Sequence, residues 1–141
     1  MRARSVAVAA ALLAAGGVLP SASAQESQAD LCAVSIGRGA TVPGGATGTL
    51  TVRNVGRACR VVNFTVPEQR VATSRLEVVR APAHGRAVVI EPNVVAYRPD
   101  PGYVGPDEFQ YEGSGPGRDG QALPFSVRIQ VRVVDRGEPL R

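Results

Sequence analysis

The sequence predicts an all-β sandwich of about seven or eight short strands in a single domain. Apolar and polar residues alternate with a period of two in several segments, most regularly between Phe125 and Val133. Turn-forming residues separate these segments, and no stretch keeps the i, i+3, i+4 apolar spacing of an amphipathic helix over a useful length. The 16 glycines and 11 prolines also interrupt the chain too often for long helices.

The first four expected strands alternate apolar side chains with polar ones, as does a strand with one buried face. They occupy residues 32–36, 49–55, 59–66 and 75–80. Their alternating apolar residues include Leu50 and Val52, then Val62, Phe64 and Val66, then Leu76 and Val78. Turn formers at 43–45 and 54–56 lie between them, which predicts tight connections.

Turn formers likewise delimit the last four expected strands. These strands occupy residues 87–91, 94–98, 107–112 and 123–134. The last is the most regular, and we expect it to be a long strand lying on the core. The glycine-rich stretch 113–120 is expected to be a loop, because neither a lysine nor a helix start follows it as a phosphate-binding loop requires. Since no internal repeat is visible, residues 31–135 are expected to form one domain, followed by a flexible tail at 136–141.

The start of the chain has the pattern of a secretory signal peptide, assigned to residues 1–24. Arg2 and Arg4 precede an apolar run from Val6 to Ala15, and Ala22-Ser23-Ala24 matches a cleavage site. The run is shorter than the about 20 residues that span a bilayer. Residues 25–30 would then form a flexible leader. This pattern predicts an exported protein, periplasmic or secreted, with no transmembrane segment in the mature chain.

The charge of the mature chain argues against nucleic acid as a partner. Without the signal peptide, the chain has 14 arginines and 12 acidic residues, which gives a net charge of +2. The arginines are scattered singly and form no basic stripe that could follow a phosphate backbone.

Cys32 and Cys59 are expected to form a disulfide, because an exported domain meets an oxidising compartment. On the chain-entropy account this bond would stabilise the fold by roughly 3 to 4 kcal/mol. A metal pair or a redox pair is the alternative. Both are disfavoured because the cysteines form no C-x-x-C motif and His84 is the only histidine.

Aromatic residues and turn glycines cluster between positions 97 and 111. Phe109 and Tyr111 share one face of an expected strand, which favours a role as core anchors. Gly105 lies where the chain must turn, and Asp107 can accept hydrogen bonds from backbone amides of the turn entering its strand. The core motif predicted here consists of Tyr97, Tyr103, Gly105, Asp107, Phe109 and Tyr111.

Residues 81–134 resemble the cadherin-like and Ig-like modules of bacterial surface proteins. The matching features are Ala-Pro-Ala-His-Gly at 81–85, Tyr97-Arg98-Pro99, Gly102-Tyr103-Val104-Gly105, Asp107, Phe109-Gln110-Tyr111 and the alternating final strand. The resemblance implies an Ig-like β-sandwich and an extracytoplasmic scaffold or adhesion module. Such modules often occur in tandem arrays, whereas this chain has one copy.

Chemical sites are few in this sequence. No Gly-x-Ser-x-Gly motif is present, and the adjacent Asp107 and Glu108 would point to opposite faces of a strand, so no enzyme activity and no catalytic residues are expected. His84 is expected to be a hairpin-turn residue. No cofactor is expected either. Asp100, Asp107 and Asp119 are weak calcium candidates, because they lie in or beside loops that could converge.

These observations predict a non-enzymatic binding or structural module of the cell envelope. Its partner would be a protein or another envelope component, bound at a strand edge or at end loops such as 113–120. A carbohydrate-binding module is the first alternative, and it would require Tyr97, Tyr103 and Tyr111 in one exposed row. An inhibitor of a secreted hydrolase is the second, although no reactive-loop pattern supports it.

Overall fold

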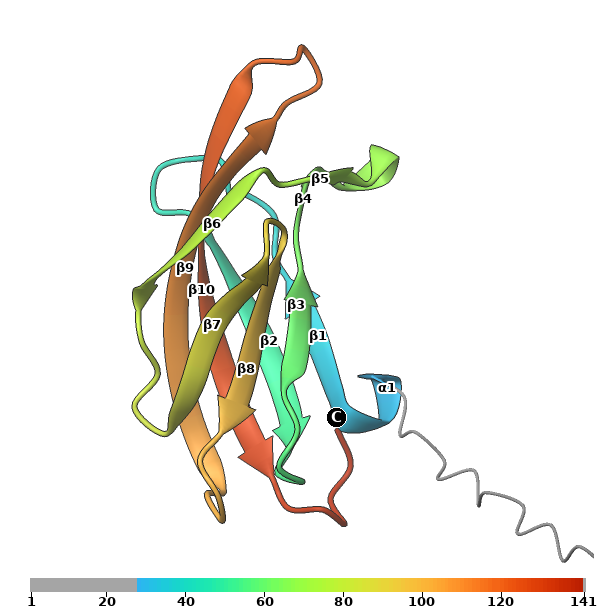
Figure 1. Cartoon of the computed structure of the whole chain (residues 1–141), viewed down its shortest axis with the longest axis vertical. Coiled ribbons are helices and arrows are strands. Elements are labelled where there is room, and N and C mark those ends of the chain that lie inside the picture. Colours follow the sequence, from blue (N-terminus) through green and yellow to red (C-terminus); the bar gives the residue numbers. More distant parts are fainter. Residues whose placement is uncertain (1–27, 141) are drawn as a thin grey trace, which may run out of the picture.

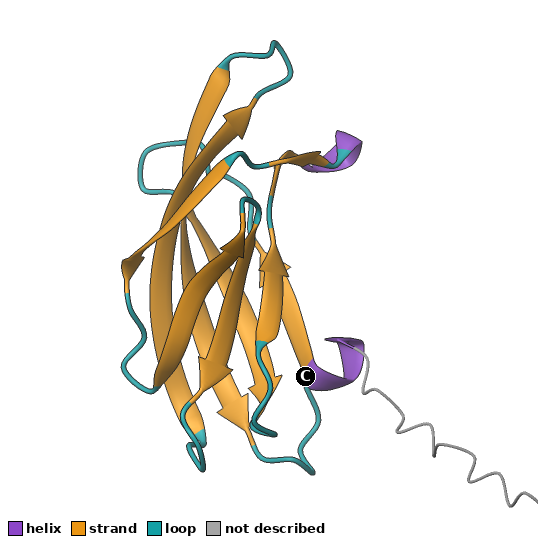
Figure 2. Cartoon of the chain, in the orientation of Figure 1, coloured by secondary structure: helices purple, strands orange, loops and turns teal. Residues whose placement is uncertain are grey.

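The protein is an all-β structure, as predicted. The computed structural model describes residues 28–140, in which ten strands carry almost all of the regular structure and the two helices are single turns (Figures 1 and 2). The elements are α1 (Gln28–Leu31), β1 (Cys32–Ile36), β2 (Ala46–Arg53), β3 (Cys59–Val62), β4 (Phe64–Val66), η1 (Pro67–Gln69), β5 (Val71–Ala72), β6 (Arg75–Arg80), β7 (Gly85–Glu91), β8 (Val94–Pro99), β9 (Gly105–Pro116) and β10 (Ala122–Val134).

The strands form a five-stranded sheet, a three-stranded sheet and one small pair. The five-stranded sheet has the order β1-β2-β10-β9-β6, the three-stranded sheet has the order β3-β8-β7, and β4 pairs with β5. Among the pairings described, β2 with β10 is parallel and the rest are antiparallel. Strand β10 therefore lies at the centre of the larger sheet, between β2 and β9.

One hydrophobic core is shared by the two sheets. The predicted alternation of β10 is confirmed, since Val127, Ile129, Val131 and Val133 are all buried. The larger sheet also contributes Leu50, Val52, Phe109 and Tyr111, and the smaller sheet contributes Val61, Val95 and Tyr97. The predicted disulfide is present: Cys32 on β1 is bonded to Cys59 on β3, so it joins an edge of one sheet to an edge of the other.

The prediction of a loop at 113–120 is wrong for its first half. Residues 113–116 continue β9, and hydrogen bonds Gly117 N to Gln121 O and Gly120 N to Gly117 O form the turn. Gly113 lies where neighbouring elements come very close, because a Cβ there would be 2.5 Å from the Arg75 carbonyl oxygen. Glycine at this site reflects tight packing within a strand. The β9–β10 hairpin consequently extends beyond the smaller sheet (Figure 1).

Three further segments have structure that the sequence did not predict. The single strand predicted at 59–66 is interrupted at Asn63, which is buried and donates a hydrogen bond to the Val61 carbonyl oxygen. The predicted leader ends in the helical turn α1, whose Leu31 is buried in the core. In the predicted tail, the Glu138 carbonyl oxygen accepts a hydrogen bond from Arg53 Nε at 3.0 Å.

The predicted signal peptide, residues 1–24, lies outside the described residues. Within residues 28–140, neither helix has the length or the apolar character needed to cross a membrane.

Candidate functional site: a groove between two sheet edges

Three of the four aromatic residues of the predicted core motif form a column between the sheets. The rings of Tyr97 and Phe109 stack with centroids 5.5 Å apart, and Phe109 and Tyr111 follow at 6.2 Å. All three side chains are fully buried. Tyr97 belongs to β8 of the smaller sheet and the other two to β9 of the larger one, so the column packs one sheet against the other.

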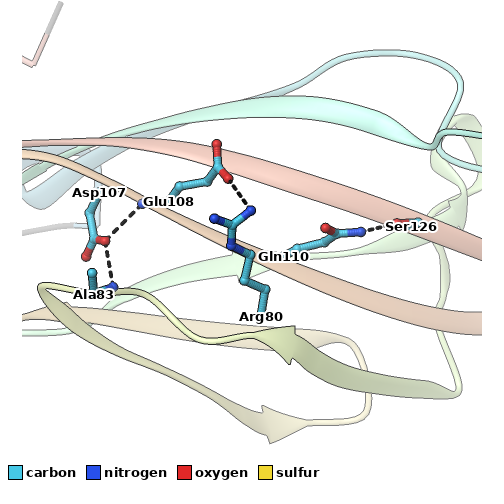
Figure 3. A network of polar contacts seen from close by, with 6 residues as sticks. All are labelled: Arg80, Ala83, Asp107, Glu108, Gln110 and Ser126. Atoms are coloured by element: carbon cyan, nitrogen blue, oxygen red, sulfur yellow. Dashed lines mark hydrogen bonds and ion pairs between the residues drawn. The ribbon is translucent and has the colours of Figure 1, made fainter.

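Asp107 is a buried carboxylate with four hydrogen-bond donors around it. Its Oδ1 accepts from the backbone amides of Ala83 at 3.0 Å and Glu108 at 2.9 Å (Figure 3). Its Oδ2 accepts from the amide of His84 at 3.1 Å and from the phenol of Tyr97 at 2.7 Å. Asp107 was expected to accept hydrogen bonds from amides of the turn that enters its own strand. This prediction is wrong, because two of its backbone donors belong to residues 83 and 84 and the third is the next residue, Glu108. Asp107 instead fixes the connection between β6 and β7.

Both buried phenols act as donors that tie the sheets together. Burial raises the pKa of Tyr97, and the hydrogen bond to Asp107 raises it further. Burial also raises the pKa of Tyr111, although its hydrogen bond to Asn63 Oδ1, 2.6 Å long, lowers it in part. Both side chains therefore remain protonated donors throughout the physiological pH range.

Asp107→Ala is expected to destabilise the protein by about 2 to 4 kcal/mol, because it leaves buried donors without an acceptor. The measurement is the free energy of unfolding in urea. Asp119→Ala is the matched control, since Asp119 is exposed and accepts one bond from the Gln121 amide. A loss for Asp107→Ala no larger than that of the control would show that this network does not stabilise the fold.

The remaining members of the core motif lie at the end of β8. Gly105 has a φ of 141°, a conformation that favours glycine, in agreement with the predicted turn. Tyr103 is only partly buried and its ring stacks on His84 with centroids 4.2 Å apart. The prediction that His84 is a hairpin-turn residue is wrong. It belongs to the 81–84 connection, which leads from β6 of the larger sheet to β7 of the smaller one.

The three calcium candidates do not come together. Asp119 lies in the turn of the β9–β10 hairpin, whereas Asp100 and Asp107 lie near the opposite end of that ribbon, where Gly105 pairs with Val133. Asp119 cannot approach the other two carboxylates, because the paired strands β9 and β10 separate them along the whole length of the hairpin. No cluster of three or more metal-ligating side chains occurs in residues 28–140.

The row of exposed tyrosines required for carbohydrate binding is absent. Tyr97 and Tyr111 are fully buried. Sequence reasoning placed these rings correctly in the core, and the structure leaves Tyr103 as the one partly accessible tyrosine of the described chain.

Strands β1 and β3 lie next to each other along one side of the molecule (Figure 1). Residues of both strands line a groove. Both are edge strands of their sheets, and the disulfide closes one end of the space between them. This end is lined by Gln28, Ala29, Cys32, Val34, Ile36, Arg60 and Val62. We call this feature the β1–β3 groove.

The β1–β3 groove continues past Ile36 and Val62, which line both parts, into a second hollow of about 510 Å³. That volume falls within the range of ligand-binding clefts, about 300 to 1,000 Å³. Its apolar lining includes Phe64, Phe125 and Val127, and Glu68 lies at its rim in an ion pair with Arg118. The groove is therefore mostly apolar, and the charged residues of its lining are Arg38, Arg60 and Glu68.

Sequence reasoning missed the β1–β3 groove because it depends on which strands are neighbours in space. Val34 and Ile36 share the face of Cys32 by alternation, which predicts that they are buried, yet they are 39% and 36% exposed. The smaller sheet ends at β3 and does not cover them.

The fold and groove together define an all-β protein of two sheets with an open apolar seam along one side. Comparison with protein families and with curated proteins gives no match for this chain.

Proposed function

We propose that the protein is an exported, non-enzymatic binding module with an Ig-like fold, which takes up an extended segment of a partner protein in the β1–β3 groove. The observation that carries this proposal is the arrangement of two edge strands, β1 and β3, on either side of a mostly apolar groove. The partner segment would add a strand to one edge and place alternate side chains in the groove.

The order of the strands supports the Ig-like assignment. When β1, β4 and β5 are set aside, seven strands remain, which can be lettered A to G in chain order. The third, sixth and seventh then lie together in one sheet, and the second, fifth and fourth lie together in the other. This is the C-F-G and B-E-D grouping of Ig-type sandwiches. The first strand pairs with the seventh in parallel, as an A strand that has joined the C-F-G sheet.

Strand addition suits the chemistry of the β1 edge. β1 pairs with β2 on one side, and in the described residues its other side has no strand partner. The unpaired amides and carbonyls of such an edge are a template for another chain. The exposed Val34 and Ile36 would then be covered by apolar side chains of the added strand, which the hydrophobic effect favours.

The proposed location in the periplasm or outside the cell depends on two features. Residues 1–24 have the pattern of a secretory signal peptide, and the Cys32–Cys59 disulfide is stable in an oxidising compartment. We therefore place the partner among proteins of the cell envelope.

Ile36→Asp is expected to abolish partner binding, because a carboxylate would have to be buried against the added strand. The mature protein is immobilised and exposed to envelope extract, and the retained proteins are identified by mass spectrometry. Val104→Asp is the matched control, since Val104 is 52% exposed and lies in the connection between β8 and β9, away from the groove.

The proposal predicts a protein that is retained by the wild type and by Val104→Asp and is lost from Ile36→Asp. Val34→Asp, from the same strand, should lose the same protein, since Val34 also lines the groove and is 39% exposed. Circular dichroism establishes that each variant is folded. If the same proteins are retained by all four forms, the groove is not the binding site.

A further inference from the structure

The outer face of the three-stranded sheet differs from that of the five-stranded sheet. On the larger sheet, the outward positions of β10 are polar, as in Arg128 and Gln130, and those of β2 are threonines. On the smaller sheet, the first two outward positions of β8 are Val94 and Ala96, which are only 1% and 5% exposed. From Val94 to Tyr97, strand β8 is therefore apolar on both faces, as strands are when both faces are covered.

An ion pair provides part of this cover. In the register of the sheet, Arg60 on β3 is opposite Ala96 on β8, and Glu91 on β7 is opposite Val94. Arg60 Nη2 and Glu91 Oε1 are 2.5 Å apart, so the two side chains reach each other across the outer face of β8. Next to them, Val62 and Val88 occupy outward positions on the two flanking strands and are 45% and 42% exposed.

Two arginines face each other at the other end of this surface. Arg86 on β7 and Arg98 on β8 are direct cross-strand partners, so their side chains lie on the same outer face. Like charges in such a pair are destabilising. The ion pairs found in residues 28–140 include neither arginine, and Asp100, two residues beyond Arg98, bonds to neither of them.

We propose that the outer face of the β3-β8-β7 sheet is a second interaction surface, which binds an acidic segment of a partner protein. Two guanidinium groups can each bind a carboxylate through paired hydrogen bonds. An aliphatic side chain of the partner would cover Val88 between the arginine pair and the Arg60–Glu91 pair. Charge complementarity identifies the occupant, because a carboxylate placed between Arg86 and Arg98 removes the repulsion that the free protein tolerates.

The proposal separates binding from stability. Arg86→Gln with Arg98→Gln removes the like-charge pair, so the double variant should melt at the same temperature as the wild type or higher. The same double variant should lose binding. A merely structural role for the arginines would move both properties in the same direction, because a weaker fold would also bind less.

The test uses a short fluorescein-labelled peptide of alternating glutamate and valine, with fluorescence anisotropy as the readout. The wild type should bind this peptide and should not bind the peptide in which glutamine replaces glutamate. Arg86→Gln with Arg98→Gln should weaken binding by about tenfold or more, since charge pairs between partners are lost. Arg128→Gln with Arg136→Gln is the control, because it removes the same charge from exposed positions away from this sheet and should bind like the wild type.

Several outcomes would overturn the proposal. These are absence of binding by the wild type, equal weakening in both double variants, or equal binding of the glutamine peptide. Binding to vesicles of phosphatidylglycerol without binding to the glutamate peptide would assign the arginines to a lipid surface instead. A dimer in sedimentation that is lost in Arg86→Gln with Arg98→Gln, with no peptide binding, would assign the face to a second copy of the chain.

Discussion

Phe109→Ala is expected to lower the free energy of unfolding by about 3 to 5 kcal/mol, the usual loss when a buried aromatic side chain is removed from a core. Phe109 is fully buried and stands between Tyr97 and Tyr111 in the column that packs the two sheets together. The substitution removes both ring contacts and leaves a cavity between two tyrosines. Those tyrosines cannot move into it without giving up their hydrogen bonds to Asp107 and Asn63.

Urea unfolding followed by circular dichroism measures this loss. Phe64→Ala is the matched control, since it deletes the same ring from a partly exposed position at the β1–β3 groove, where Arg70 lies over it. We expect the control to lose far less stability. A loss below about 1 kcal/mol for Phe109→Ala would mean that the ring is not a core anchor, because emptying a core site of this size exceeds that figure.

Loss of the Cys32–Cys59 disulfide is expected to lower stability by about 3 kcal/mol or slightly more on the chain-entropy account. The bond closes a loop with a sequence separation of 27 residues. It also holds β1 against β3, and β1 has little other inward packing, since Val34 and Ile36 are uncovered. We therefore expect β1 to open before the rest of the larger sheet when the bond is removed.

Thermal melting with and without a reductant measures this effect, and hydrogen exchange locates it. The variant with both cysteines replaced by alanine should melt at the lower temperature and should not respond to the reductant. Amide hydrogens of β1 should exchange faster in this variant than in the wild type. The order in which the amide hydrogens of β9 and β10 exchange should not change. Free thiols in the native purified protein would contradict the disulfide itself.

Local alternation was sufficient to predict most of the strands. It predicted the inward set of β10 and the shared face of Phe109 and Tyr111, because a period of two depends only on neighbours along the chain. It did not predict that β9 continues through 113–116. Glycine there matches a loop signal, whereas its actual cause is close contact with Arg75 from another strand.

The site depended on contacts between segments far apart in the sequence. Asp107 accepts bonds from residues 83 and 84, which lie more than 20 positions earlier, and nothing in the residues around it identifies those donors. The β1–β3 groove likewise requires the order of strands in both sheets. The cysteines were the one sequence feature that could have linked β1 to β3, since a disulfide brings its two backbones together.

The position of β10 constrains the order in which this protein can assemble. It is the last strand of residues 28–140, and the larger sheet is built around it: β2 pairs with one side and β9 with the other. Until it emerges, the hairpin of β1 and β2 has no bond to the rest of that sheet. When the chain leaves a ribosome or a secretion channel from its N-terminus, the larger sheet therefore stays incomplete until β10 has emerged. Its folding is dominated by contacts between distant segments, which form slowly.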